Sequence, residues 1–408
     1  MNIIDDKHGC LQADFKEIND MSIFDEVIER KNTDSIKYDF AEKWGMPKDI
    51  LPLWVADMDF RVPACIIEAM TEKCTYGIFG YSESRDDYFD VLKSWFERRH
   101  GWQISPEWLV KTPGVVNAIC TAVRAFTERG DSIIIQQPVY YPFANAVTSN
   151  DRKLIVSELK YSENQYSVDF EDFENKIITN QVKLFILCNP HNPVGRVWTR
   201  EELERMGDIC VRHSVKVVSD EIHADFVYPG YRHIVFAALK QEYSRLTITC
   251  TAPSKTFNIA GLQLSNIFIE NGELMQKFRA EMTRSGIFGV NVMGITACKA
   301  AYKYGDDWLE ELKKYLLSNL DFLRKFLCER LPQIRLVEPE GTYLAWLDFR
   351  QLGMDDNELK ELIINKAGLW LDEGTLFGQG GEGFQRVNIA CPISVLEEAL
   401  LRLESALR

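Results

Sequence analysis

The stretch Val182-Lys-Leu-Phe-Ile-Leu-Cys188 runs directly into Asn189-Pro-His-Asn-Pro-Val-Gly-Arg196. The first part is an apolar run typical of a strand buried on both faces, and the second is rich in loop-forming residues. Thr199 and Glu202 have the spacing of a capping box, which predicts that a helix begins there. Val215-Lys-Val-Val218 then predicts a second strand. Strand, loop, helix and strand at this spacing indicate a βαβ unit with parallel strands.

Further apolar runs lie on both sides of this unit, at Ser132 to Ile135, Lys153 to Val156 and Leu246 to Cys250. Their repetition predicts an α/β fold with a mostly parallel central sheet flanked by helices on both faces. Beyond Gly305 the pattern changes to a long amphipathic helix, Trp308 to Leu331, followed by mixed strand and helix signals. This part predicts a smaller α+β domain.

These patterns divide the chain into four expected parts. A weakly ordered extension covers residues 1–20, and a segment that joins the small domain covers residues 21–60. The large domain covers residues 61–304, and the small C-terminal domain covers residues 305–408.

The composition is that of an ordinary globular protein and excludes several function classes. The 47 basic and 61 acidic side chains give a net charge of −14, which disfavours nucleic acid and anionic membranes as partners. The 10 cysteines stand singly, without a Cys-x-x-Cys pair, so we expect neither a metal site nor a disulfide framework. The chain has no long apolar run and does not start with a signal sequence, so we expect a cytoplasmic protein.

Thr112-Pro-Gly-Val-Val-Asn-Ala118 predicts the start of a helix, which we expect to end at Gly130. A glycine turn at a helix start exposes free backbone N–H groups. Together with the positive end of the helix dipole, these groups form a candidate phosphate site. Many helices begin in this way without a ligand, so the motif alone decides nothing.

Gly378-Gln-Gly-Gly-Glu-Gly383 has the spacing of a dinucleotide-binding motif. That motif requires a helix directly after it, whereas a strand pattern follows here. We therefore interpret the segment as a flexible glycine-rich loop.

Polar side chains follow the predicted strands, namely Asn192, Asp220, His223 and Lys255. Ligands bind at the carboxyl ends of the strands in open α/β sheets. Lys255 lies in Thr251-Ala-Pro-Ser-Lys-Thr-Phe-Asn258, where a proline break follows a strand. A lysine in such a place is by default an exposed surface residue, and a lone histidine is as often structural as functional.

Four ordered motifs make the chain similar, over nearly its whole length, to the fold type I pyridoxal-phosphate enzymes. They are Asn189-Pro-His-Asn-Pro-Val-Gly195, Ser219-Asp-Glu-Ile-His223, Ser254-Lys-Thr-Phe-Asn258 and Gln385-Arg-Val-Asn-Ile-Ala390. Three further segments resemble in particular the cystathionine β-lyase branch, of the MalY/PatB type, of the class I/II aminotransferase superfamily. These are Leu53-Trp-Val-Ala-Asp-Met-Asp-Phe60, Phe79-Gly-Tyr81 and Ala252-Pro-Ser-Lys-Thr-Phe-Asn-Ile-Ala-Gly261.

The resemblance implies that pyridoxal 5′-phosphate is the cofactor, and it assigns roles to the polar residues. Lys255 would form a Schiff base with the cofactor aldehyde and, once freed, would move the Cα proton of the substrate. Asp220 would pair with the pyridine nitrogen, and Asn192 would hydrogen-bond the ring hydroxyl. Tyr140 would stack on the ring. His223 would orient Asp220 or reach the ring oxygen.

The resemblance also implies where the cofactor phosphate binds. The helix start at Gly114, Val115 and Val116 would hold it, with help from Ser254 and from the Thr251 hydroxyl. Many relatives have a phosphate-binding arginine eight residues after the lysine, whereas this chain has Gln263 there. The phosphate of this chain would therefore meet less positive charge.

The substrate contacts implied by the resemblance come from separate parts of the chain. Arg386 would bind the α-carboxylate through its planar guanidinium, with Ala56 and Asn192 beside it. Tyr81 would reach the active site of the neighbouring subunit, as a candidate catalytic residue, so a homodimer would be the active unit. Relatives also have a cis X-Pro bond in the corresponding loop, which predicts a cis bond between Asn192 and Pro193.

The implied reaction is α,β-elimination from cystathionine or a related cysteine S-conjugate, which gives pyruvate, ammonia and a thiol. An aminotransferase shares these motifs and stays open as the alternative, because only the branch resemblance favours the lyase. A noncatalytic regulator with this fold is a third alternative, disfavoured by the acidic charge and by the lack of a DNA-binding signal.

Overall fold

A seven-stranded sheet forms the centre of the computed structural model, which describes residues 22–408. The expected extension at residues 1–20 lies outside the described residues. The strands, in the order in which they lie side by side, are β2 (Leu109–Thr112), β10 (Ser265–Phe268), β9 (Thr247–Thr251), β8 (Lys216–Asp220), β7 (Leu184–Cys188), β3 (Ser132–Gln137) and β4 (Lys153–Glu158). Only β10 runs antiparallel to its neighbours, so the predicted mostly parallel sheet is confirmed.

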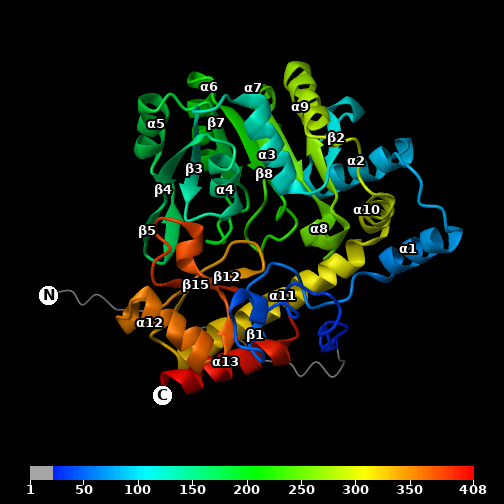
Figure 1. Cartoon of the computed structure of the whole chain (residues 1–408). Helices are drawn as coiled ribbons and strands as arrows, with labels where there is room; N and C mark the ends of the chain where they lie inside the picture. Colours follow the sequence, from blue (N-terminus) through cyan, green and yellow to red (C-terminus); the bar gives the residue numbers. More distant parts are fainter. Residues whose placement is uncertain (1–21) are drawn as a thin grey trace.

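Helices cover both faces of this sheet (Figure 1). On β7, Leu184 and Ile186 belong to one buried cluster, whereas Phe185 and Leu187 belong to another. Successive residues of a strand point to opposite faces, so a strand covered on both sides needs a continuous apolar run. The first cluster includes α3 (Val115–Phe126), α4 (Pro142–Thr148) and α9 (Gly272–Arg284), and the second includes α5 (Phe170–Thr179) and α6 (Arg200–Arg212).

Two helix ends illustrate what local sequence decides. The capping box at Thr199 and Glu202 is formed as predicted and begins α6. The prediction that the helix after Gly114 ends at Gly130 is wrong, because α3 ends at Phe126. Thr127 is already extended, with φ −138° and ψ 157°, and its hydroxyl donates to the Val123 carbonyl oxygen at 2.5 Å. This side chain satisfies a carbonyl group of the last turn, which would otherwise lack a donor.

The C-terminal part contains a four-stranded antiparallel sheet, in the order β11 (Arg335–Val337), β12 (Leu344–Asp348), β15 (Phe384–Asn388) and β14 (Asp372–Glu373). Its helices are α11 (Asp306–Arg330), α12 (Asp356–Lys360), which continues as a π-helical turn at Glu361–Lys366, and α13 (Ile393–Leu407). The glycine-rich segment 378–383 is a loop that leads into β15, in agreement with the strand pattern that follows it. The expected boundaries at residues 60 and 304 stay predictions.

The remaining elements lie around these two sheets (Figure 1). They are α1 (Ala64–Tyr76), α2 (Asp86–His100), α7 (Gln241–Ser244), α8 (Pro253–Thr256), α10 (Val292–Tyr304) and the hairpin of β5 (Lys160–Ser162) with β6 (Gln165–Ser167). The N-terminal segment returns to the C-terminal part, because β1 (Leu51–Pro52) pairs in parallel with β13 (Leu369–Trp370). The Asn192–Pro193 bond is cis, as predicted, and Gln137–Pro138 and Asn189–Pro190 are cis as well.

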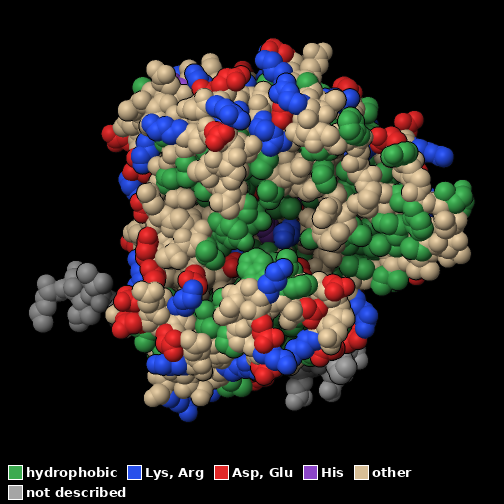
Figure 2. Space-filling view, viewed as in Figure 1, with side chains coloured by type: hydrophobic (Ala, Val, Ile, Leu, Met, Phe, Trp, Pro, Cys, Tyr) green, Lys and Arg blue, Asp and Glu red, His purple; other side chains and the backbone are tan. Residues whose placement is uncertain are grey.

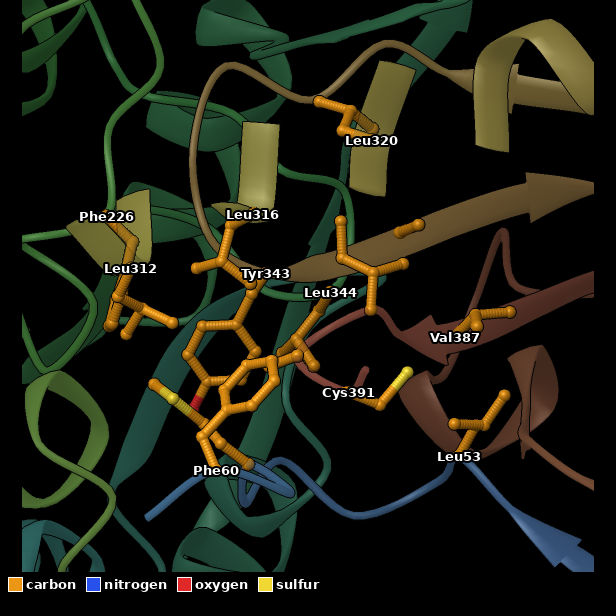
Figure 3. Close-up of a cluster of buried hydrophobic side chains, with 14 of the residues drawn as sticks. Leu53, Phe60, Phe226, Leu312, Leu316, Leu320, Tyr343, Leu344, Val387 and Cys391 are labelled. Carbon is orange, nitrogen blue, oxygen red and sulfur yellow. The ribbon is translucent and has the colours of Figure 1, made fainter. Parts of the chain in front are cut away.

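A buried apolar cluster joins the N-terminal segment to α11 and the small sheet (Figure 3). Leu53 and Phe60 come from the N-terminal segment, Leu316 from α11, and Leu344 and Val387 from the small sheet. These side chains are at most 5% exposed. Their packing holds the segment 53–60 at a fixed position under the large sheet.

No helix within residues 22–408 is long and apolar enough to cross a membrane. In the same range, no group of three or more His, Cys, Asp and Glu side chains is arranged to hold a metal ion.

Candidate active site

A hollow lies between the large sheet and the C-terminal part, and basic and histidine atoms are visible inside it among hydrophobic ones (Figure 2). The predicted strand-end residues come from three neighbouring strands. Asp220 is the last residue of β8, Asn192 lies in the loop after β7, and Lys255 lies in α8 after β9. The carboxyl ends of these parallel strands share one edge of the sheet, which brings the three side chains together.

Lys255 is not the exposed surface residue that a lone lysine suggests. The residue is half-buried, and its Nζ donates a hydrogen bond to the Ala56 carbonyl oxygen at 2.7 Å. Desolvation lowers the pKa of the Lys255 amine to about 8, and the positive charge of Arg386 acts in the same direction. The carboxylates of Asp57 and Asp220 oppose this shift. An amine with a pKa near neutrality is suited to take up and release a proton.

Asp220 is buried, with 4% of its surface exposed. Burial raises the pKa of its carboxyl to about 7, and the Ile222 N–H, which donates to Oδ1 at 3.1 Å, opposes the shift. The other oxygen, Oδ2, accepts no hydrogen bond from any residue in 22–408. This oxygen is available to a protonated nitrogen of a ligand, which would provide the missing counter-charge.

Arg386 extends from β15 and is 3% exposed. Its Nη1 donates to Asn192 Oδ1 at 3.0 Å, and its Nη2 donates to the Trp54 carbonyl oxygen at 2.7 Å. Nη2 also pairs with the carboxylate of Asp372, which lies opposite Arg386 in the register of β14 and β15. The Nε of Arg386 is buried and has no partner among the described residues. These contacts hold the guanidinium in one plane and leave a donor for an anion.

His223 and Tyr140 also lie at this site. His223 is 3% exposed, and its Nδ1 is buried without a partner in the described part of the chain. Desolvation lowers the pKa of the His223 ring well below its usual value, and the positive charges of Lys255 and Arg386 add to this effect. The backbone N–H of Tyr140 donates to the Asn192 carbonyl oxygen at 3.0 Å, and burial raises the pKa of the Tyr140 phenol.

The predicted phosphate site is the start of α3. Gly114 is the N-cap residue and has φ 100°, a conformation that glycine adopts at little cost. The N–H groups of Val115 and Val116 have no backbone acceptor, and Asn117 Oδ1 is buried without a partner among the described residues. Ser254, which directly precedes Lys255 in the sequence, is half-buried.

Two other predicted phosphate neighbours make different contacts. The Thr251 hydroxyl donates to the Asn266 carbonyl oxygen at 2.8 Å, so its proton is already used. Gln263 is exposed and contributes no charge.

Tyr81 does not join the other site residues within one chain. It is fully exposed, in the loop between α1 and α2, and forms no hydrogen bond or ring contact with another described residue. Large apolar side chains around it are also exposed, namely Tyr76, Ile78 and Phe79.

Sequence reasoning missed several residues that hold this site. Asp372 fixes Arg386, and Tyr343 donates from its hydroxyl to the Ala56 carbonyl oxygen at 3.0 Å. Asp225 accepts from the Thr256 hydroxyl at 2.7 Å and lies 3.1 Å from His100 Nε2. The only available signal was the position of Asp225, two residues after His223 and close to the Ser219 to His223 motif.

A lysine and an aspartate at the carboxyl edge of a seven-stranded sheet, with a buried arginine from a smaller sheet, define the class of fold type I pyridoxal-phosphate enzymes. The family described as "Aminotransferase class I and II" matches residues 48–403. The chain belongs to this family, and within it to the cystathionine β-lyase branch.

The relatives of this branch match almost the full chain. The chain is 44% identical to cystathionine β-lyase PatB of Bacillus subtilis over 94% of its length and 99% of that protein. It is 34% identical to protein MalY of Escherichia coli over 94% of its length and 98% of that protein.

Solved structures agree with this placement. Cystalysin of Treponema denticola, which contains pyridoxal 5′-phosphate, superposes with a TM-score of 0.91 at 40% identity and covers 94% of this chain and 98% of its own. The pyridoxal-phosphate-bound C–S lyase of Staphylococcus hominis has a TM-score of 0.89 at 34% identity and covers 95% and 99%.

Proposed function

We propose that this chain is a pyridoxal-phosphate-dependent carbon–sulfur β-lyase. It cleaves cystathionine or a related cysteine S-conjugate into pyruvate, ammonia and a thiol. The observation that carries the proposal is the Lys255 amine, which has a pKa of about 8 and lies at the same edge of the large sheet as Asp220. Arg386 from the smaller sheet is close enough for its charge to act on this amine. Relatives named cystathionine β-lyase, which match nearly the whole chain, support the choice of reaction.

The unpartnered polar atoms of the site fit the parts of pyridoxal phosphate. Asp220 Oδ2 suits the pyridine nitrogen, and the buried, unpartnered Nδ1 of His223 suits an adjacent ring oxygen or a water. The free N–H groups at the start of α3 suit the phosphate. The Lys255 amine suits the aldehyde, and the Tyr140 ring suits the face of the pyridine.

Bound pyridoxal phosphate would supply an electron sink that lowers the barrier to removal of the substrate's Cα proton. The residues of the chain move the proton and hold the ring nitrogen in its charged form. Lys255 Nζ takes the proton from Cα when its amine is neutral. Asp220 holds a proton at the ring nitrogen, because its buried carboxylate needs a positive partner. The Cα–H and Cβ–S bonds break, a Cα=Cβ double bond forms, and the thiol leaves with a proton. Water then hydrolyses the released enamine to pyruvate and ammonia.

Arg386 and Asn192 orient the amino-acid substrate. The Arg386 guanidinium is held by Asp372 and by the Trp54 carbonyl, so it binds a carboxylate without first losing side-chain freedom. The Asn192 Oδ1 accepts from Arg386, which leaves its Nδ2 for the cofactor ring hydroxyl. A carboxylate bound here places the Cα–H bond in front of Lys255.

The active unit is a homodimer in which Tyr81 enters the neighbouring site, as a catalytic and phosphate-binding residue. The exposure of Tyr81 together with Ile78 and Phe79 supports this assignment, because apolar side chains gathered in one exposed loop favour a protein partner. A cytoplasmic location and a division of the chain at residues 60 and 304 belong to the same proposal.

An aminotransferase is the second candidate, because the family as a whole bears that name and some relatives carry it. The two functions differ in whether a keto acid is required. We expect the purified protein to release pyruvate and thiol from cystathionine over many turnovers without a keto acid. Release that stops after one equivalent per active site would contradict the lyase.

A further inference from the structure

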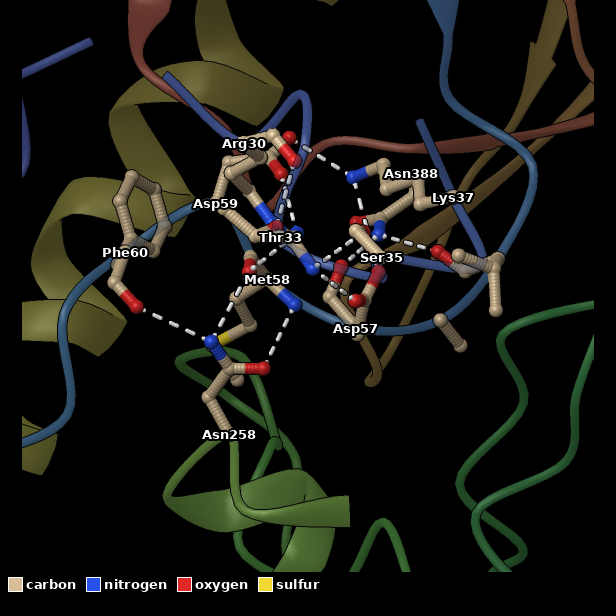
Figure 4. A network of polar contacts seen from close by, with 12 residues as sticks. Arg30, Thr33, Ser35, Lys37, Asp57, Met58, Asp59, Phe60, Asn258 and Asn388 are labelled. Atoms are coloured by element: carbon tan, nitrogen blue, oxygen red, sulfur yellow. Dashed lines mark hydrogen bonds and ion pairs between the residues drawn. The ribbon is translucent and has the colours of Figure 1, made fainter. Parts of the chain in front are cut away.

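The loop that carries Ala56 is held by side chains from both sheet-containing parts (Figure 4). Asn388 Nδ2 donates to the Val55 and Asp57 carbonyl oxygens at 2.8 and 2.7 Å. On the other side, Asn258 accepts from the Met58 N–H at 2.9 Å and donates to its carbonyl oxygen at 2.9 Å. Asn258 lies three residues after Lys255, so the loop and the lysine share one rigid support.

Two carboxylates of this loop meet two cations from the N-terminal segment (Figure 4). Asp59 is buried and pairs with Arg30 at 2.6 Å and with the fully buried Lys37 at 2.7 Å. Asp57 pairs with Arg30 through Oδ2 at 2.7 Å. Its Oδ1 is buried and accepts no hydrogen bond from the described residues, and Lys37 Nζ lies 3.8 Å away. The charge of Asp59 is therefore fully paired, whereas that of Asp57 is only partly paired.

Asp57 follows Ala56, whose carbonyl oxygen accepts a hydrogen bond from the Lys255 amine. We propose that Asp57 is a positioning residue that sets the proton affinity of the Lys255 nitrogen, with Arg30 as the counter-charge that limits its effect. The inference rests on the proposed role of Lys255 as the proton-transferring group. It adds a residue outside the motif that carries the lysine.

The charges that face Lys255 explain why Asp57 has this influence. Arg386 disfavours the protonated amine, whereas Asp57 and Asp220 favour it, and Asp57 acts more strongly than either of the other two. His223 is kept neutral by burial and adds no charge, and Tyr343, whose hydroxyl shares the Ala56 carbonyl oxygen, has its phenol pKa raised by burial. A cofactor on Asp220 would neutralise that carboxylate, which leaves Asp57 as the carboxylate acting on the lysine.

A purely structural role for Asp57 would make it equivalent to Asp59, since both anchor the same loop to Arg30. An electrostatic role separates them, because Asp57 directly follows Ala56, which accepts a hydrogen bond from the Lys255 amine, and has a buried oxygen without a hydrogen bond from the described residues. The charge of Asp59 is instead paired with both Arg30 and Lys37. The two carboxylates therefore form a matched pair for a test. Asp39 is an exposed control in the N-terminal segment. Its carboxylate accepts hydrogen bonds from the backbone N–H groups of Asn32, Thr33 and Ser35.

The test measures the titration of the Lys255 nitrogen in the full chain in two ways. One arm follows the visible absorbance of the enzyme loaded with pyridoxal phosphate as the pH changes. The other arm follows acetylation of Lys255 by acetic anhydride in the cofactor-stripped enzyme, with the modified peptide identified by mass spectrometry. Asp57→Asn should lower the midpoint by about half to one pH unit in both arms, because a nearby negative charge is lost.

Arg30→Gln should raise both midpoints, because it removes the counter-charge of Asp57, and this opposite sign is not expected from loss of loop anchoring. Asp39→Asn should leave them unchanged, and Asp59→Asn should lower stability without a comparable shift. Equal shifts in Asp57→Asn and Asp59→Asn, or no shift in Asp57→Asn, would overturn the inference. If the loaded enzyme shows no lysine-bound cofactor absorbance, the proposed function fails, whereas the acetylation arm still decides the role of Asp57.

Discussion

Arg386 Nη1 donates a hydrogen bond of 3.0 Å to Asn192 Oδ1, and this contact links the small sheet to the loop after β7. Arg386 belongs to the small sheet, whereas Asn192 lies in a loop of the large sheet. The guanidinium is also fixed by Asp372 and by the Trp54 carbonyl. If Arg386 binds the substrate carboxylate as proposed, substrate recognition depends on the relative placement of two sheets that lie far apart in the sequence.

Replacing this arginine tests the assignment of the carboxylate site. Arg386→Lys keeps the positive charge but loses the planar, two-pronged donor. We expect kcat/KM for cystathionine to fall about 100-fold, which corresponds to about 2.7 kcal/mol, with cofactor content unchanged. Arg350→Lys is a suitable control, because Arg350 pairs with Asp348 on the outer part of the same sheet. An unchanged kcat/KM in Arg386→Lys would show that the carboxylate binds elsewhere.

Asp220→Asn tests the partner of the ring nitrogen. The amide is isosteric but neutral, so the protein should fold and bind pyridoxal phosphate, yet lose the electron sink. We expect exchange of the substrate's Cα proton with deuterium, followed by NMR, to slow at least about 100-fold. Exchange at the parent rate would mean that Asp220 has another role.

The pH dependence follows from the shifted pKa of Lys255. Lys255, with a pKa of about 8, is protonated below that pH and cannot accept the Cα proton. The pKa of Asp220 is about 7 without a partner, and a protonated ring nitrogen beside it should lower that pKa, so Asp220 should stay charged. We therefore expect kcat/KM to rise from pH 6 and to level off above pH 8. A kcat/KM that falls across this window would contradict the assignment of Lys255 as the base.

Mixing two inactive variants tests whether Tyr81 serves the neighbouring subunit. Tyr81→Ala and Lys255→Ala should each be nearly inactive. A hybrid dimer has one site with neither change if Tyr81 crosses to its partner. Random exchange then restores about a quarter of the parent activity, because half of the dimers are hybrids with one intact site of two. If Tyr81 serves its own subunit, each of the two sites of a hybrid carries one of the two changes, so no activity returns. Asp220→Asn mixed with Lys255→Ala gives the baseline without recovery, because both residues serve the site of their own chain.

Much of the large sheet was predictable because its determinants are local. The run at 182–188 must be apolar throughout to be covered on both faces, and the capping box at Thr199 is read from four residues. Asn192, Asp220 and Lys255 could be expected at one edge because parallel strands align their carboxyl ends.

The rest of the site depends on contacts that no local pattern reveals. Asp372 faces Arg386 only through the register of two strands, and Asp57 acts on Lys255 only because Asn258 and Asn388 hold the loop beside it. The end of α3 was misplaced for a related reason. A glycine at residue 130 is a common helix stop, but the backbone is already extended at Thr127, whose hydroxyl donates to the Val123 carbonyl oxygen.

The most direct test of the central claim compares two reactions of the same purified protein. In one, cystathionine is given without a keto acid, and pyruvate and thiol are measured over time. In the other, alanine is given with 2-oxoglutarate, and glutamate is measured. A lyase should turn over cystathionine many times and alanine at least about 100-fold more slowly, a preference that needs about 2.7 kcal/mol between the two barriers. The opposite ratio would make the protein an aminotransferase and would contradict the proposed function.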